Sequence, residues 1–160
     1  MIDGFLFVLT FLAALGCAMM AGVFFAFSAF MMKALARLPA EQAIAAMQAI
    51  NVAAVTFAFM AALFGTAVAC GALALWALFA WGERFAPYLL VGSALYLVGT
   101  IVLTIVYHVP RNEALATMEP RGADAESHWR RYLSGWTAWN HVRAAAALAA
   151  ATTLTIALHV

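Results

Sequence analysis

Four long stretches of the chain carry no charged residue, and this spacing limits the possible folds more than any other feature. Only 15 of the 160 residues are charged, and none of them falls within 4–32, 42–82, 85–110 or 144–160. A helix needs ~20 mostly apolar residues to cross a bilayer. The first three stretches meet that length outright. The fourth meets it if the helix begins near Trp136 and the long side chain of Arg143 reaches the headgroups.

These lengths predict an all-α fold, a four-helix transmembrane bundle with spans at about 4–32, 52–81, 87–109 and 136–160. We expect one integral-membrane domain, residues 1–160, because the chain is short. Short connections give an up-down-up-down topology, with one polar cytoplasmic loop between the third and fourth helices. Each helix must pair its own backbone polar groups, because lipid offers no partners.

The composition excludes several classes of protein. Hydrophobic residues make up 68% of the chain and charged residues only 9%, whereas a soluble domain has about 25% charged residues. The net charge of +1 gives no attraction for nucleic acid. Cys17 and Cys70 lie in apolar runs, as small buried residues do, and predict neither a disulfide framework nor a metal site. The expected partners are the lipid bilayer and a lipophilic small molecule.

The basic residues predict the orientation in the membrane. Four spans place both termini and the 82–86 turn on one side, where Arg84 is the single basic residue. The other side carries seven: Lys33, Arg37, Arg111, Arg121, Arg130, Arg131 and Arg143. Loops rich in Lys and Arg stay in the cytoplasm. We therefore predict a bacterial inner-membrane protein with both termini outside.

Two connections and the small residues on the helix faces add further expectations to the predicted bundle. Pro39 is typical of a first helical turn, and 39–50 forms either an interfacial helix or an extension of the second span. The segment 111–135 is expected to be a loop followed by a short helix over 125–133. Small residues such as Gly16 and Gly22 let helix backbones approach closely. They serve either packing within the bundle or a homodimer face.

Polar side chains gather at the cytoplasmic end of the predicted bundle. Asn51 lies at the start of the second span, and His108 and Asn112 lie at the end of the third. The fourth opens with Trp136, Trp139, Asn140, His141 and Arg143. Polar groups inside a membrane are costly and tend to mark functional sites. We therefore predict a cavity at this end, lined by Asn51, His108, Asn112, Trp136, Asn140 and His141.

Spacing along the fourth helix arranges several of these groups. Trp136, Asn140 and Arg143 follow one another at i, i+4 and i+7 and share a face, while His141 lies about 100° away from Asn140. Headgroup binding and an aromatic belt at the interface remain alternative roles for these residues.

The two histidines at this depth raise the question of a cofactor. His108 and His141 could together ligate a metal or a haem, or one imidazole could act as a neutral base or hydrogen-bond partner. No HxxxH, CxxCH or ExxH spacing occurs. We therefore assign no metal ligand, and the cofactor stays open.

Four segments carry a resemblance to a known family. They are residues 21–28 (AGVFFAFS), residues 38–51 (from Leu38-Pro39 to Met47-Gln48-Ala49-Ile50-Asn51), residues 109–112 (VPRN) and residues 136–143 (WTAWNHVR). Together they resemble the anthrone oxygenase-like family of small four-helix membrane proteins. The chain departs from it at His108, where members often carry Asn.

The resemblance implies an activity, because some fungal members oxidise anthrones to anthraquinones with dioxygen. An anthrone is flat and apolar, and its methylene proton is acidic. A base, an oxyanion holder and aromatic walls suffice without a cofactor. His141 or His108 would be the base, and Asn140, Asn112 or Arg143 would hold the oxyanion. Trp136 and Trp139 would stack on the rings. The alternative is a non-catalytic membrane subunit or a lipophile-binding scaffold.

Overall fold

The computed structural model describes residue 2 and residues 4–160. Throughout this part of the chain, the secondary structure is helical and contains no strand, which confirms the all-α prediction. The first helix consists of α1 (Gly4–Ala26), the π-helical segment η1 (Phe27–Met31) and α2 (Met32–Leu35). Next come α3 (Ala40–Ala53) and α4 (Phe57–Phe79). The fourth continuous helix joins α5 (Ala86–Tyr96), η2 (Leu97–Val102), η3 (Thr104–His108) and α6 (Val109–Ala116), and α7 (Ala125–Ala157) follows.

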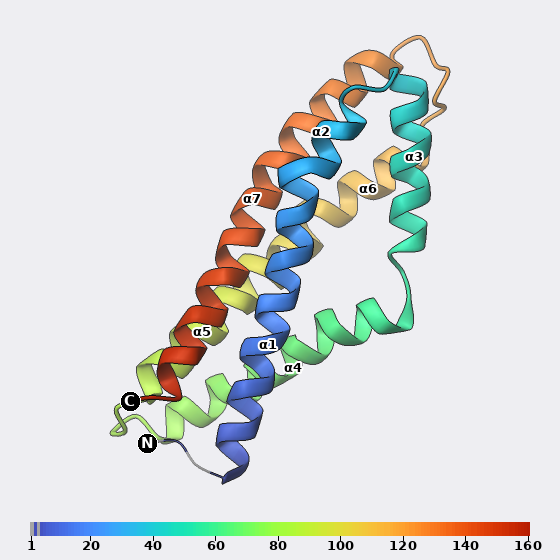
Figure 1. The fold of residues 1–160 in the computed structure, drawn as a ribbon. Helices are drawn as coiled ribbons and strands as arrows, with labels where there is room; N and C mark the ends of the chain where they lie inside the picture. The colour runs from blue at the N-terminus through green and yellow to red at the C-terminus, as the bar shows by residue number, and fades with distance from the viewer. Residues whose placement is uncertain (1, 3) are drawn as a thin grey trace.

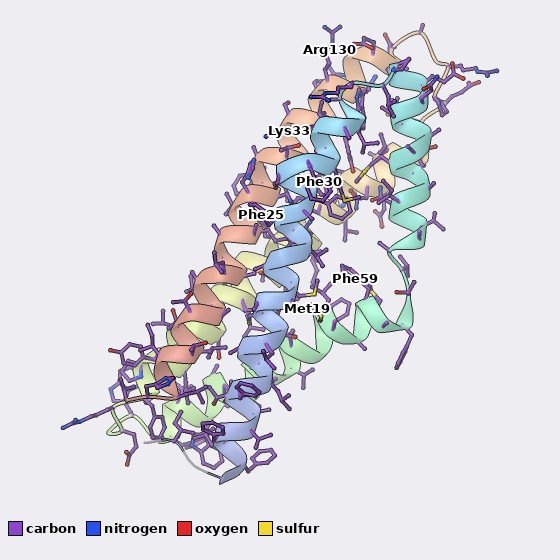
Figure 2. The ribbon with its side chains drawn as sticks, in the orientation of Figure 1. Met19, Phe25, Phe30, Lys33, Phe59 and Arg130 are labelled. Atoms are coloured by element: carbon purple, nitrogen blue, oxygen red, sulfur yellow. The ribbon has the colours of Figure 1, made fainter. Side chains whose placement is uncertain are left out.

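Three of these continuous helices are long and apolar enough to cross a membrane: Gly4–Leu35, Phe57–Phe79 and Ala86–Ala116. Large apolar side chains also cover much of the outer surface, among them Met19, Phe25 and Phe30 (Figure 2). An extensive exposed apolar surface is typical of a membrane-contacting protein. The predicted fourth span lies within α7, whose first half carries charges, and it stays a prediction.

The second predicted span differs from the structure at its start. Helix α3 is a separate helix, so 39–50 is not an extension of α4. Thr56 has an extended backbone, and its hydroxyl accepts a hydrogen bond from the Phe59 N–H. Ser and Thr favour this capping position because they satisfy a free N–H at the helix start. The apolar run therefore divides into two helices at Thr56. Charge spacing did not predict this break, because no charged residue lies near it.

The fourth predicted helix also begins elsewhere. The structure joins the expected short helix over 125–133 and the expected span from 136 into one helix, α7, of 33 residues. Trp129, Tyr132 and Trp136 are all buried on one face. This stripe continues without a break into the apolar half, so nothing ends the helix between the two parts.

The helices pack into two apolar cores. The larger lies among α1, α4, α5 and α7 and contains Leu73, Tyr96 and Leu154. The smaller lies among α2, α3 and the first half of α7 and includes Ile44 and Trp129. Helix α7 runs alongside α1 for most of its length, and α4 diverges from α3. The helices therefore separate in the middle of the molecule, between the larger core at the end with the C-terminus and the smaller core at the other end (Figure 1).

Some of the small residues serve packing inside the bundle. A Cβ built on Gly16 would collide with the side chain of Thr66, and one on Gly99 would collide with the Cβ of Ala146. These contacts join α1 to α4 and η2 to α7. By contrast, a Cβ on Gly22 would meet nothing within 4 Å. A homodimer through the remaining small residues stays a prediction.

Gly16 and Gly22 of α1 give a matched test of this packing. We expect Gly16→Ala to lower the free energy of unfolding by about 1–3 kcal/mol, because the added methyl overpacks the contact with Thr66. Gly22→Ala, on the same helix, should leave stability unchanged or slightly raised. Unfolding of the detergent-solubilised variants measures both, and equal effects would contradict the close approach of α1 and α4.

Candidate functional site

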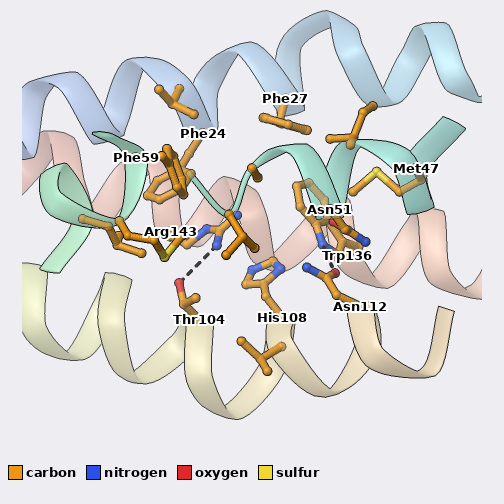
Figure 3. Close-up of a pocket in the computed structure, with 17 residues that line it drawn as sticks. Phe24, Phe27, Met47, Asn51, Phe59, Thr104, His108, Asn112, Trp136 and Arg143 are labelled. Atoms are coloured by element: carbon orange, nitrogen blue, oxygen red, sulfur yellow. Dashed lines mark hydrogen bonds between the residues drawn. The ribbon is translucent and has the colours of Figure 1, made fainter. Parts of the chain in front are cut away.

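A cavity of about 180 Å³ lies between the two cores, where the five continuous helices of the described residues meet (Figure 3). Apolar side chains form most of its wall, including Phe24, Phe27, Met47 and Phe59. Its polar lining consists of Asn51, Thr104, His108, Asn112, Trp136 and Arg143. An apolar cavity of roughly 150 Å³ is large enough to hold benzene. This cavity therefore has room for an aromatic ring beside its polar groups.

Two π-helical segments present side chains to the cavity. Phe27 lies in η1, and both Thr104 and His108 lie in η3. The widened turn of a π-helix changes which residues share a face, and such segments occur often at functional sites. In η3, Thr104 and His108 both line the cavity, and their spacing of four residues places them on the same face of the helix.

Arg143 is buried at the cavity wall, with 6% of its surface exposed. Its guanidinium donates to Asn140 Oδ1 from Nε at 3.2 Å and from Nη2 at 2.6 Å, and Nη1 donates to Thr104 Oγ1 at 3.1 Å. The guanidinium carbon lies 3.9 Å from the ring centroid of Phe24 and 5.6 Å from that of Trp136. Among the described residues no carboxylate pairs with it. Neutral oxygens and aromatic faces therefore stabilise this charge.

Asn140 holds Arg143 in place and also joins two helices. Its side chain is fully buried, and its amide donates to the Phe24 carbonyl oxygen at 2.7 Å and to Ser28 Oγ at 2.6 Å. Both acceptors belong to the first helix, whereas Asn140 belongs to α7. The donors therefore face the first helix, and the amide oxygen is left to accept from the guanidinium.

His108 is the least satisfied polar side chain in the cavity. It is 1% exposed, and neither ring nitrogen has a hydrogen-bond partner among the described residues. Its ring meets that of Trp136 edge-on, with centroids 5.0 Å apart. Asn51 Nδ2, on the same cavity wall, also lacks a partner. Buried polar groups are nearly always hydrogen-bonded, so these two groups are available to a ligand.

Asn112 completes the polar wall through fixed contacts. Its Oδ1 accepts from the Tyr132 hydroxyl at 2.9 Å and from Trp136 Nε1 at 3.1 Å. Burial raises the pKa of the Tyr132 hydroxyl above its ordinary value, so the phenol remains a protonated donor. These two bonds link α6 to α7 and orient the indole toward the cavity.

The structure brings together most of the predicted site residues but not all of them. Asn51, His108, Asn112, Trp136 and Arg143 line the cavity. Asn140 lies behind Arg143 rather than on the wall.

His141 and Trp139 lie outside the cavity. His141 is exposed and lines separate shallow grooves along the seam between the first helix and α7. Trp139 is 43% exposed and packs on Tyr107. The prediction that His141 lines the cavity is therefore wrong, because the buried face of α7 follows Trp136, Asn140 and Arg143 and turns His141 away from it.

This placement also separates the two histidines considered for a metal or haem. His108 lines the cavity and His141 lines the outer grooves, so the two imidazoles do not share a site. Across the described residues, no group of three or more His, Cys, Asp or Glu side chains is arranged to hold a metal ion.

Sequence reasoning missed Thr104 and the phenylalanines of the wall. Thr104 precedes His108 by four residues, and that spacing on a helix was a usable signal. Phe24 and Phe27 had no such signal, because exposed Phe25 and Phe30 belong to the same run and resemble them in sequence.

Comparison with known proteins now bears on this site. The family model described as anthrone oxygenase matches residues 53–153, more than half of the chain. The chain belongs to the anthrone oxygenase family. The match confirms the resemblance seen in the sequence, and it includes His108, Asn112, Asn140 and Arg143 but not the first helix. No curated protein and no solved structure matches the chain.

Asn140 offers a test of how this family member holds its buried arginine. We expect Asn140→Ala to lower the free energy of unfolding by about 1.5–3 kcal/mol, because it removes hydrogen bonds to a buried charge. Thr152→Ala is the control, since Thr152 is exposed and bonds only to the Leu148 carbonyl of its own helix. That variant should stay within about 0.5 kcal/mol of wild type. Equal stability of both variants would contradict the role given to Asn140.

Proposed function

We propose that the cavity binds a flat lipophilic aromatic ketone of the anthrone type and that the protein catalyses its oxidation by dioxygen. One observation carries this proposal: an unpartnered imidazole, His108, and a fixed guanidinium, Arg143, face the same apolar-walled cavity (Figure 3). A base and a cation close to one another are what proton abstraction next to a carbonyl requires. Membership of the family supports the choice of substrate.

The proposal includes the placement of the chain in a bacterial inner membrane. The second half of α7, from Trp136, forms the fourth span and completes an up-down-up-down bundle. Lys33 and Arg130 lie at the end far from the C-terminus (Figure 2), and seven of the eight basic residues belong to the segments of that side or to the first turns of the fourth span. That end faces the cytoplasm, and both termini face outward. The cavity then lies within reach of the cytoplasmic interface.

Binding uses the apolar wall for the rings and the guanidinium for the oxygen. Phe24, Phe27 and Trp136 provide aromatic surface on which a fused ring system packs. The carbonyl oxygen of the substrate accepts a hydrogen bond from Arg143. Asn140 and Thr104 keep the guanidinium fixed, so little reorganisation is needed when negative charge develops on that oxygen.

The chemistry follows from these two groups. His108 removes one methylene proton, and the resulting enolate oxygen is stabilised by Arg143. The carbanion carbon of the enolate reacts with dioxygen and, after taking back the proton, becomes a hydroperoxide. Loss of water then breaks the O–O bond and the second C–H bond and leaves a ketone. One oxygen atom enters the product, the other leaves as water, and dioxygen takes up the four electrons that the substrate loses.

His108 of η3 and His141 of α7 separate this mechanism from others. We expect His108→Gln to lower the turnover of an anthrone by about 10²–10⁴-fold, the usual contribution of a general base. His141→Gln should keep wild-type turnover, because His141 lies outside the cavity. Oxygen uptake by the detergent-purified protein measures both variants, and Gln retains polarity at each position.

Two outcomes of this assay would overturn the mechanism. Loss of turnover in His141→Gln with normal turnover in His108→Gln would identify His141, in the outer grooves, as the base instead of His108. If wild type consumes no oxygen above the spontaneous rate yet is stabilised against heat by anthraquinone, the protein is a lipophile-binding scaffold. A rise in melting temperature with anthraquinone, without any turnover, would thus support ligand binding in the cavity and contradict the proposed enzymatic activity.

A further inference from the structure

We propose that a second site, a basic groove between α6 and the start of α7, binds the phosphate of an anionic phospholipid. The groove encloses about 270 Å³. Its lining includes Tyr107, Arg111, Leu115, Met118, His128 and Arg131. None of these residues lines the cavity described above, so the proposal does not depend on the proposed function.

The charges of the groove all have one sign. Two arginines, Arg111 and Arg131, line it beside His128, and no carboxylate does. The ion pairs found among the described residues involve other arginines, Arg121 with Glu41 and Arg130 with Glu126. The groove therefore concentrates positive charge that the rest of the fold does not neutralise.

The two arginines differ in how they are held, and both are able to donate. The guanidinium carbon of Arg111 lies 3.4 Å from the ring centroid of Tyr107, and Nη1 donates to the Tyr107 carbonyl at 3.2 Å. A guanidinium has five N–H donors, so Arg111 is oriented and still has donors free. The guanidinium of Arg131 has no hydrogen bond or ion pair in the described part of the chain. Arginine suits this role because its planar donor set matches phosphate oxygens.

The position of the groove along the helix favours a lipid over a free anion. The charge-free stretch 85–110 ends directly before Arg111. Tyr107, one turn earlier, packs on Trp139 with ring centroids 5.1 Å apart, and Trp139 is 43% exposed. Exposed Trp and Tyr side chains gather at the level of the lipid headgroups. The groove therefore begins at the depth where a phospholipid phosphate lies, and Leu115 and Met118 provide apolar surface for its glycerol carbons.

Adjacent arginines of α7 provide a matched test. The purified protein is titrated in a neutral detergent with phosphatidylglycerol, phosphatidylcholine or inorganic phosphate, and bound lipid is counted by native mass spectrometry. We expect phosphatidylglycerol to bind more tightly than either of the others. Arg131→Gln and Arg111→Gln should each raise its Kd by roughly fivefold, and the double variant by about 25-fold. Arg130→Gln, next in sequence but outside the groove and paired with Glu126, should bind like wild type.

Three results would overturn the proposal. If Arg130→Gln lost as much affinity for phosphatidylglycerol as Arg131→Gln, the lipid would be attracted by the positive surface in general and not by the groove. Equal binding of phosphatidylcholine would remove the requirement for an anionic lipid. Inorganic phosphate that competes at the same concentration as the lipid would make the groove a site for a free anion. All three substituted arginines are exposed, and circular dichroism checks that each variant keeps its helices.

Discussion

A single buried charge, the guanidinium of Arg143, determines how the polar end of this bundle is organised. Transfer of such a group out of water costs several kcal/mol even after relaxation. No carboxylate offsets that cost among the described residues. The protein instead surrounds the charge with the oxygens of Asn140 and Thr104 and with the ring of Phe24. These partners come from three different helices, so solvating the arginine also fixes the helices relative to one another.

The cavity follows from the same arrangement. At the end with the C-terminus, small residues bring the helices together, as where Gly92 faces Leu154. Between the two cores, large aromatic side chains and Arg143 lie between the helices, and α4 diverges from α3 after Thr56 (Figure 1). The space left between them is apolar on most sides and polar where His108 and Asn51 have no protein partner. The space for a ligand thus lies between two packed cores.

The sequence predicted the parts of this structure that depend on length and on regular spacing. Charge-free stretches located the apolar helices, and the i, i+4, i+7 pattern placed Trp136, Asn140 and Arg143 on one face. The start of α7 at Ala125 agrees with the short helix predicted over 125–133. The boundary at Thr56 and the continuity of α7 across 134–135 were missed, because a cap within an apolar run and a continuous buried stripe are set by packing. The side of α7 on which His141 lies was implied by its 100° offset from Asn140. The position of His108 on the cavity wall was predicted from its depth along the chain, whereas the π-helical geometry of η3 was not predicted.

The central claim is that His108 meets an aromatic ligand inside the cavity, and nitrogen NMR of the histidine rings tests it most directly. The protein has four histidines, so ¹⁵N-histidine labelling in detergent gives a small set of signals that His→Gln variants assign. On addition of anthraquinone, which is not turned over, the account predicts a shift of the His108 ring nitrogens alone. A shift of His141 with His108 unchanged, or no shift at saturating ligand, would contradict it.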